Sequence, residues 1–390
     1  MAAAAPSAAN PPAADAGEPL TLAEAQALAL KNHPQIMASD LQLEAAKQSV
    51  KIARSNYLPQ ATGNAVSAFA DDNTRVMAGN GISNPTILDR GAYGVSLSQL
   101  ITDFGRTSDL VDASKLQVDA QKSRADWTRE TVLLNVTRAY YSVLRAQALV
   151  KVAQSTQHAR ATFLDQMTSL KEARMKSNLD VNLARQGVQE AGLLKLRADS
   201  ALNDAQGALA EALGYSDTHH FALADEAAIT PYPATLEPLL DQALQSNPEI
   251  VALRAEWEAA RKQADAEEKA EYPTVSAMAY AGDTPFYDSG ASINRTYGVA
   301  GVNVSIPLYT GGRLSAQRKK SSYQADATKQ QLDAKTNVLS RDIRAAWNNT
   351  RTAFENIEVS KNLLSNNRET LDLIQARYEL GKSSIVELAQ

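Results

Sequence analysis

The chain has 390 residues, a net charge of −5 and no cysteine, and it is 44% apolar but only 6% aromatic. The absence of cysteine excludes disulfides, thiolate catalysis and Cys-ligated metals, and the negative charge offers no basic face for nucleic acid. No run approaches the roughly 18 consecutive apolar residues of a membrane-spanning helix. If the chain crosses a membrane, it must therefore do so as closed β-structure.

Residues 1–19 are rich in Ala and Pro and have neither a basic start nor a long apolar run. We expect a flexible N-terminal segment there and not an intact signal peptide. Beyond it, a short helix that breaks before a proline occurs twice, at His33-Pro34 and at Asn247-Pro248. Because proline is favourable in the first turn of a helix, each break predicts the start of a second helix. The two prolines lie 214 positions apart (248 − 34).

Two β-hairpins are predicted next. They cover about 61–103 and about 274–309, with strands at about 61–71, 92–103, 274–283 and 297–309. The last strand shows the clearest alternation, since Val302 and Val304 alternate with Asn303 and Ser305. A period of two residues indicates a strand, and lengths of roughly 10–12 residues are near the 9–11 that cross a bilayer obliquely.

Each hairpin leads through glycine into a long stretch without proline. The first junction holds Gly105-Arg106 and the second holds Gly311-Gly312-Arg313, at an offset of 207 (313 − 106). The glycines most simply supply a sharp strand-to-helix bend. Apolar residues then recur at helical spacing, and a first long helix of about 70 residues would be about 105 Å long.

Each long helix then reaches a turn. In the first copy the long helix is expected to end near Met175 and the chain to return, so that a helical hairpin covers 106–213. In the second copy a helix from residue 312 reaches its turn shortly before Gln390, and its return helix is expected to be truncated. These patterns predict an α+β fold with an internal structural duplication. The expected divisions are a first repeat at 20–215, a linker at 216–236 and a second repeat at 237–390.

The order and constant offset of these motifs resemble the TolC-type outer-membrane factors, the outer membrane efflux protein family. The likeness covers residues 20–390 and rests on the Asn/His-Pro breaks, the Tyr57-Leu-Pro and Tyr272-Pro strand entries, and the segments Ile306–Arg313 and Arg377–Gly381. It implies a homotrimer in the outer membrane of a Gram-negative bacterium. Each protomer would give four strands to a shared 12-stranded transmembrane β-barrel, and its helices to a long α-helical barrel that extends into the periplasm.

The resemblance also implies a function, that of a passive exit duct in a tripartite efflux pump or a type I secretion system. The implied partners are a periplasmic adaptor (membrane fusion) protein, an inner-membrane RND or ABC transporter, and outer-membrane lipid. Neither catalytic activity nor a cofactor is implied. The residues themselves favour oligomerisation, because two hairpins cannot close a barrel and open strand edges are not tolerated in lipid. The alternative is a soluble periplasmic coiled-coil scaffold or adaptor, which explains the long helices but not four strands of bilayer length.

The family pattern puts acidic residues just after each helical turn, where they ring the closed pore. Asp180 and Glu387 match those positions and lie 207 apart (387 − 180). Threefold symmetry would make each a ring of carboxylates, which favours cations. The simpler alternative is a solvated charge near a helix N-terminus. Other residues near the two turns are expected to contact the tip or the adaptor: Arg174, Lys176, Gly381, Lys382 and Ser383.

Two further sites are not expected in this chain. Ser383 stands where the family pattern can carry an arginine that ties the closed state, so that latch is doubtful here. The four histidines have no second ligand at a convincing spacing, and solvation explains the adjacent pair in the linker more simply than metal binding. They are His33, His158, His219 and His220.

Overall fold

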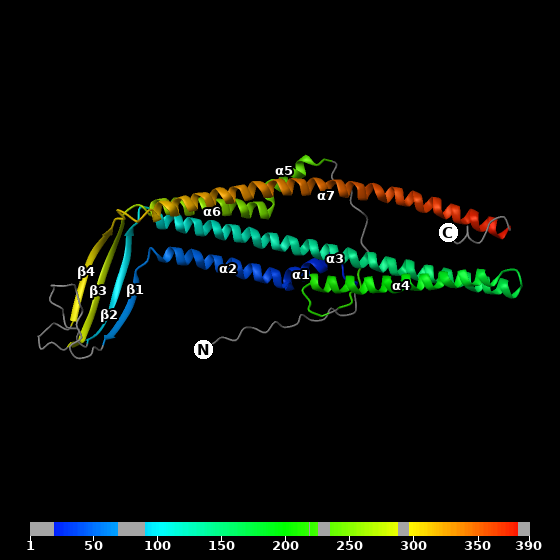
Figure 1. The fold of residues 1–390 in the computed structure, drawn as a ribbon, viewed down its shortest axis with the longest axis horizontal. Coiled ribbons are helices and arrows are strands. Elements are labelled where there is room, and N and C mark those ends of the chain that lie inside the picture. The colour runs from blue at the N-terminus through cyan, green and yellow to red at the C-terminus, as the bar shows by residue number, and fades with distance from the viewer. Residues whose placement is uncertain (1–18, 69–89, 218, 225–234, 288–295, 381–390) are drawn as a thin grey trace. The chain divides into compact units, whose positions relative to one another are not determined.

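The structure is a computed structural model, and it describes residues 19–68, 90–217, 219–224, 235–287 and 296–380 (Figure 1). Its helices are α1 (Leu22–Asn32), α2 (Pro34–Ser55), α3 (Arg106–Glu172), α4 (Asn178–Ala212), α5 (Glu237–Ser246), α6 (Pro248–Lys269) and α7 (Arg313–Glu379). Its strands are β1 (Gln60–Ala68), β2 (Arg90–Thr102), β3 (Thr274–Tyr287) and β4 (Thr296–Ser305). This mostly helical chain with one antiparallel sheet confirms the expected α+β fold.

The chain divides into two compact units. The strand unit comprises residues 40–125 and 248–334, and the helical unit comprises residues 1–39, 126–247 and 335–390. Each unit takes segments from both halves of the sequence, and α2, α3 and α7 contribute residues to both units. The expected division follows the order of the sequence instead of contacts in space. It has a first repeat at 20–215, a linker at 216–236 and a second repeat at 237–390, and it stays a prediction.

The core of the helical unit gathers around Tyr140 of α3. That side chain is fully buried, and its hydroxyl oxygen lies 2.9 Å from the carbonyl oxygens of Leu20 and Ala224. On α4, the Gln206 amide donates to the carbonyl of Phe221 at 3.1 Å and accepts from its backbone N–H at 3.0 Å. Buried polar groups require such partners. These contacts attach Leu20 and Ala224 to α3, and Phe221 to α4.

None of the helices in the described part of the chain has the length and apolar character needed to cross a membrane.

The sheet of the strand unit has the order β1-β2-β3-β4, and each neighbouring pair is antiparallel. Figure 1 shows the hairpins β1–β2 and β3–β4 joined through β2 and β3. β3 continues to Tyr287, past its expected end near residue 283. β4 ends at Ser305, before its expected end near residue 309, because Ser305 lies opposite Thr274, where β3 begins. Residues 306–309 therefore lie past the end of their partner strand.

The two faces of the sheet differ in polarity. Directly opposed residues share a face, and successive residues alternate between faces. The apolar face holds the rows Ala65/Tyr93/Asp283/Thr296, Gly63/Val95/Ala281/Gly298, Ala61/Leu97/Ala279/Ala300 and Gln99/Ala277/Val302. The polar face holds the rows Asn64/Gly94/Gly282/Tyr297, Thr62/Ser96/Tyr280/Val299 and Gln60/Ser98/Met278/Gly301. Large apolar side chains on the first face are exposed, with Val95 at 56% and Val302 at 64%.

Candidate functional site: the strand-to-helix junctions and the helical turn

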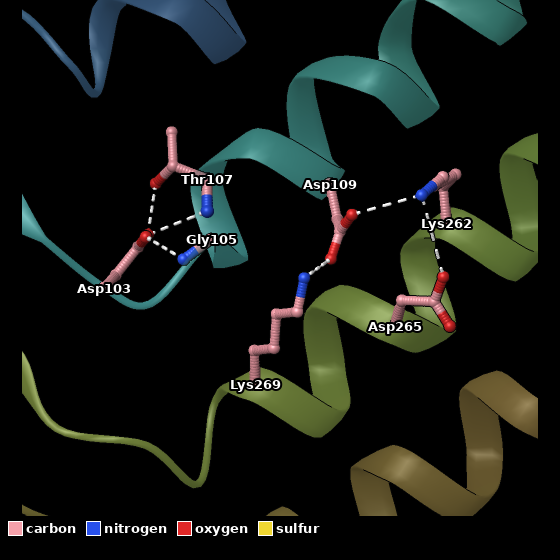
Figure 2. Close-up of polar contacts among 7 residues, drawn as sticks. All are labelled: Asp103, Gly105, Thr107, Asp109, Lys262, Asp265 and Lys269. Atoms are coloured by element: carbon pink, nitrogen blue, oxygen red, sulfur yellow. Dashed lines mark hydrogen bonds and ion pairs between the residues drawn. The ribbon is translucent and has the colours of Figure 1, made fainter.

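The first strand-to-helix junction lies between β2 and Arg106, the first residue of α3 (Figure 2). The buried Asp103 carboxylate accepts hydrogen bonds from the Gly105 N–H at 3.2 Å, and from the Thr107 N–H and hydroxyl at 2.7 and 2.5 Å. The first N–H groups of a helix have no intrahelical partner, so Asp103 caps α3. Phe104 and Gly105 make the bend with φ values of 56° and 92°.

A buried carboxylate ties α3 to α6 further along the helix. Asp109 is 5% exposed, its Oδ1 lies 3.3 Å from Lys262 Nζ, and its Oδ2 accepts a hydrogen bond from Lys269 Nζ. Figure 2 shows the two lysines approaching different oxygens of this carboxylate, with Asp265 beside Lys262. The hydrogen bond to Asp109 raises the pKa of Lys269. That lysine is therefore protonated at neutral pH and compensates the buried negative charge.

The second junction is built more simply. Gly311 and Gly312 have φ values of 61° and 80°, and α7 begins at Arg313. The Thr310 hydroxyl accepts the Leu314 N–H at 3.5 Å, and a Cβ added to either glycine would meet nothing within 4 Å. The structure places all the predicted junction residues of both copies at strand-to-helix bends. Any functional role beyond the bend stays a prediction.

The helical turn of the first copy lies between α3 and α4. α3 ends at Glu172, three residues before the expected end, and Arg174 follows with a φ of 59°. The N–H groups of Arg174 and Met175 donate to the carbonyls of Lys171 and Leu170, each at 2.8 Å, which is the pattern of a Schellman C-cap. Glycine usually occupies the left-handed position of this motif, so an arginine there is strained.

Asp180 closes a capping box at the start of α4. The Ser177 N–H and hydroxyl both donate to Asp180 Oδ2 at 2.8 Å, and the Ser177 hydroxyl oxygen accepts the Asp180 N–H at 3.3 Å. The backbone hydrogen bond from Ser177, followed by the one from its hydroxyl, lowers the pKa of the Asp180 carboxyl. Ser177 is the residue of this turn that the sequence prediction missed, although Ser-x-x-Asp before a helix is a recognisable capping signal.

The structure describes only some of the other residues predicted at the two turns. Lys176 is half-buried beside Asp180, and its positive charge also lowers the pKa of that carboxyl. Gly381, Lys382, Ser383 and Glu387 lie outside the described residues. The gate role of Asp180 and Glu387 stays a prediction, as does the contact of the other residues with an adaptor. Among the described residues, no three His, Cys, Asp or Glu side chains are grouped as metal ligands.

Sequence patterns also missed the buried groups of the first junction. Asp103 carries a readable signal, because an aspartate close before the start of a helix can accept hydrogen bonds from the free N–H groups of the first turn. Asp109 carries none, because its lysine partners Lys262 and Lys269 lie 153 and 160 positions away in the sequence. Only the packing of α6 against α3 brings these three charges together.

Two segments of the chain, residues 26–215 and 239–390, match the model of the outer membrane efflux protein family. Together they cover most of the sequence. The chain belongs to the outer membrane efflux protein family. Membership confirms the TolC-type resemblance, and the two matched segments confirm the expected internal duplication.

Several known relatives illustrate this membership in the outer membrane efflux protein family. Outer membrane protein TolC of Escherichia coli (strain K12) is 25% identical over 372 residues, which cover 92% of this chain and 73% of the relative. Outer membrane protein TolC of Vibrio cholerae is 26% identical over 390 residues, covering 94% and 83%. The solved structure of the outer membrane protein VceC from Vibrio cholerae has a TM-score of 0.77 at 18% identity and covers 94% of this chain and 88% of its own. That structure shows that the fold is shared.

Membership in the outer membrane efflux protein family confirms the expected outer-membrane location and the role of an exit duct in efflux and type I secretion. Members of this family are trimeric channels that act with partner proteins in such pumps. Channels of this kind are not enzymes. The match therefore favours the duct over the alternative of a soluble scaffold or adaptor.

Proposed function

We propose that this chain is one protomer of a homotrimeric duct, in which three four-stranded sheets close into one 12-stranded barrel in the outer membrane. One observation carries the proposal. The sheet has an apolar face and a polar face, and its outer strands β1 and β4 are each paired on one side only in the described chain. A sheet of this kind is incomplete in water and in lipid.

The polarity of the sheet supports a wall between lipid and water. Val95, Val302 and Val304 on the apolar face are 56–64% exposed in the single chain, and contact with lipid tails would remove them from water. Thr62 and Ser96 on the polar face would line an aqueous lumen. Each unpaired N–H or C=O costs several kcal/mol in hydrocarbon, so both edges require partner strands. Three copies supply them in an even-numbered antiparallel barrel.

The helical turns form the periplasmic entrance in this proposal. Asp180 and Glu387 would each make a ring of three carboxylates around the closed pore, and such rings favour cations. The hydrogen bonds from Ser177 lower the pKa of Asp180. This shift favours the ionised form of the Asp180 carboxyl in the single chain.

The proposed partners meet the duct at the same end. Arg174, Lys176, Gly381, Lys382 and Ser383 would contact a periplasmic adaptor, which links the duct to an inner-membrane RND or ABC transporter. That transporter supplies the energy, and the duct contributes no catalytic step and needs no cofactor. The junction glycines would turn each chain from the barrel into the helical tube.

Conductance in planar bilayers tests the duct and its gate. The trimer should give cation-selective current steps, and Asp180→Ala combined with Glu387→Ala should weaken the selectivity. Ser177→Ala is the matched control, because it removes the cap of α4 but leaves both carboxylates in place. It should preserve selectivity. A chain that inserts into the bilayer without conducting would contradict the proposed duct. Unchanged selectivity in the double variant would contradict only the gate role of Asp180 and Glu387.

A further inference from the structure

Two glycines lie directly opposite each other on the polar face of the sheet. Gly94 of β2 is opposed to Gly282 of β3, and the same row continues to Tyr297 of β4. Glycine in the interior of a strand often marks a site where another group approaches closely. We call the bare surface of Gly94 and Gly282 the glycine shelf. This row lies close to the start of β4, at the end of that strand away from α7 (Figure 1).

The phenol ring of Tyr297 lies across the glycine shelf. A Cβ added to Gly282 would come within 2.5 Å of Tyr297 Oη and 2.6 Å of Tyr297 Cζ. A Cβ added to Gly94 would come within 2.9 Å of the same hydroxyl oxygen. The side chain of Tyr297 therefore crosses the neighbouring strand β3 and reaches β2. These distances are too short for a Cβ, so the two glycines leave the room that the ring occupies.

This orientation differs from the usual one in a strand, where side chains stand roughly perpendicular to the sheet. On the polar face, a perpendicular side chain would point into the lumen of the proposed duct. Tyr297 instead lays the outer end of its ring against the backbone, while the residue stays 42% exposed. The glycine shelf thus keeps a large side chain out of the path along the lumen.

The neighbouring tyrosine on this face leaves the shelf to Tyr297. Tyr280 lies one row nearer α6, opposite Ser96 and Val299. Its hydroxyl lies 3.7 Å from Met278 Sδ, so its side chain points along β3 away from Gly282. The two aromatic side chains therefore extend in different directions.

We propose that Tyr297 sets the width of the lumen near its outer end, and that the glycine shelf holds the ring against the wall so that large cargo passes. The inference rests on the proposed duct, since the duct assigns the polar face to the lumen. A trimer would carry three such rings at one level of the barrel. Because passage through a pore depends on its diameter, rings that stand up would narrow this level and rings that lie flat leave it wide.

The absence of cysteine allows a test by thiol labelling of the full chain in intact cells. Ser98→Cys is the probe, because Ser98 is exposed on the polar face two rows nearer α3 than Gly94. A reagent that enters from outside must pass the level of Tyr297 to reach it. Ala92→Cys is the matched probe, one row to the outer side of Gly94 on the same face. Each probe is treated with a small maleimide and with a maleimide carried on a polyethylene glycol chain.

Gly282→Ala should slow the labelling of Ser98→Cys by the large reagent several-fold, because the ring must leave the shelf and stand in the lumen. Labelling by the small reagent, and labelling of Ala92→Cys by either reagent, should keep the wild-type rate. The added Cβ would also come within 2.5 Å of the Tyr93 carbonyl oxygen. Gly282→Ala combined with Tyr297→Ala separates the two effects, since it keeps the backbone contact but removes the ring. This combined variant should return to the wild-type rate.

Slow labelling that persists in the combined variant overturns the proposal, as does an unchanged rate in Gly282→Ala. If the glycine variants do not insert, Tyr297→Ala alone decides. It should label close to the wild-type rate, because the ring already lies against the wall. A several-fold rise would show a ring that stands in the lumen and would overturn the proposal while leaving the duct intact. An inserted Ser98→Cys chain that even the small reagent does not label would contradict the aqueous lumen, and with it the proposed duct.

Discussion

The two strand-to-helix junctions make the same bend with different chemistry. In the first copy, the buried Asp103 carboxylate accepts three hydrogen bonds, and Asp109 behind it meets two lysines of α6. In the second copy, the Thr310 hydroxyl accepts one hydrogen bond of 3.5 Å. Ala316 stands at the position equivalent to Asp109, 207 residues later. A duplicated bend thus has one charged version and one neutral version.

The difference follows from where each junction finds its partner helix. The first junction packs on α6 of its own chain, so Asp109 always has Lys262 and Lys269 available. Under the proposed trimer, the second junction would meet α2 of another copy, whose equivalent positions are Gln48 and Ser55, 214 residues earlier. Burying an unpaired charge is far more costly than burying a neutral group. A helix contact within one chain can therefore hold a buried charge, because its partner is always present. Neutral side chains suit a helix contact that forms only when the copies assemble.

The largest expected effect comes from removing the charge at the first junction. Asp109→Asn leaves two lysines without their buried partner and should destabilise the chain by about 3 kcal/mol, at the low end for broken buried pairs because the lysines are partly solvated. The matched control is Glu44→Gln, whose ion pair with Lys47 is exposed and should contribute less than about 1 kcal/mol. Chemical unfolding followed by circular dichroism compares the two variants. Equal losses would mean that the Asp109 cluster is no stronger than a surface pair.

The same cluster should weaken at alkaline pH. The pKa of Lys269 is raised by its hydrogen bond to Asp109, so its contribution to stability is fully present below the ordinary lysine pKa of about 10.4. It is lost as the pH rises through the higher pKa of the folded state. The stability difference between wild type and Asp109→Asn should therefore stay constant up to about pH 10 and shrink as the pH is raised further, to about pH 11.5. A difference that does not shrink above about pH 10 would show that the charge of Lys269 does not stabilise the junction.

The caps of the two junctions should differ in the same direction by a smaller amount. Asp103→Ala removes three hydrogen bonds from the start of α3 and should cost about 2 kcal/mol, whereas Thr310→Ala removes one long bond and should cost about 0.5 kcal/mol. Unfolding midpoints of the two single variants give the comparison. A loss at Thr310 as large as that at Asp103 would contradict the weaker cap assigned to the second copy.

The sequence predicted the bends themselves but not their chemistry. The alternation around Val302 and the glycines at 105 and 312 are local signals, and they correctly located the strands and junctions. The alternation continues past Ser305 and predicts an end of β4 near residue 309. A strand also needs a neighbour, and β3 begins only at Thr274, opposite Ser305, so residues 306–309 have no partner in β3. The Asp109 cluster was missed because its members are brought together only by helix packing.

The two copies also differ at their helical turns, and this supplies the smallest expected effect. Arg174 holds a left-handed φ of 59° at the end of α3, and the residue 207 positions later is Gly381. Arg174→Gly should therefore stabilise the turn by about 1 kcal/mol, because a side chain is disfavoured in that region. If the arginine contacts an adaptor as proposed, the same variant should bind the adaptor more weakly.

Arg174→Ala separates the two effects. Alanine keeps a Cβ, so this variant should weaken adaptor binding without raising the thermal unfolding midpoint. An Arg174→Gly variant that is no more stable than Arg174→Ala would contradict the strain assigned to this position. Full adaptor affinity in both variants would leave the strained arginine with a structural explanation alone. A gain in stability together with a loss of binding would instead show that the first copy keeps a strained, charged residue for recognition where the second copy has glycine.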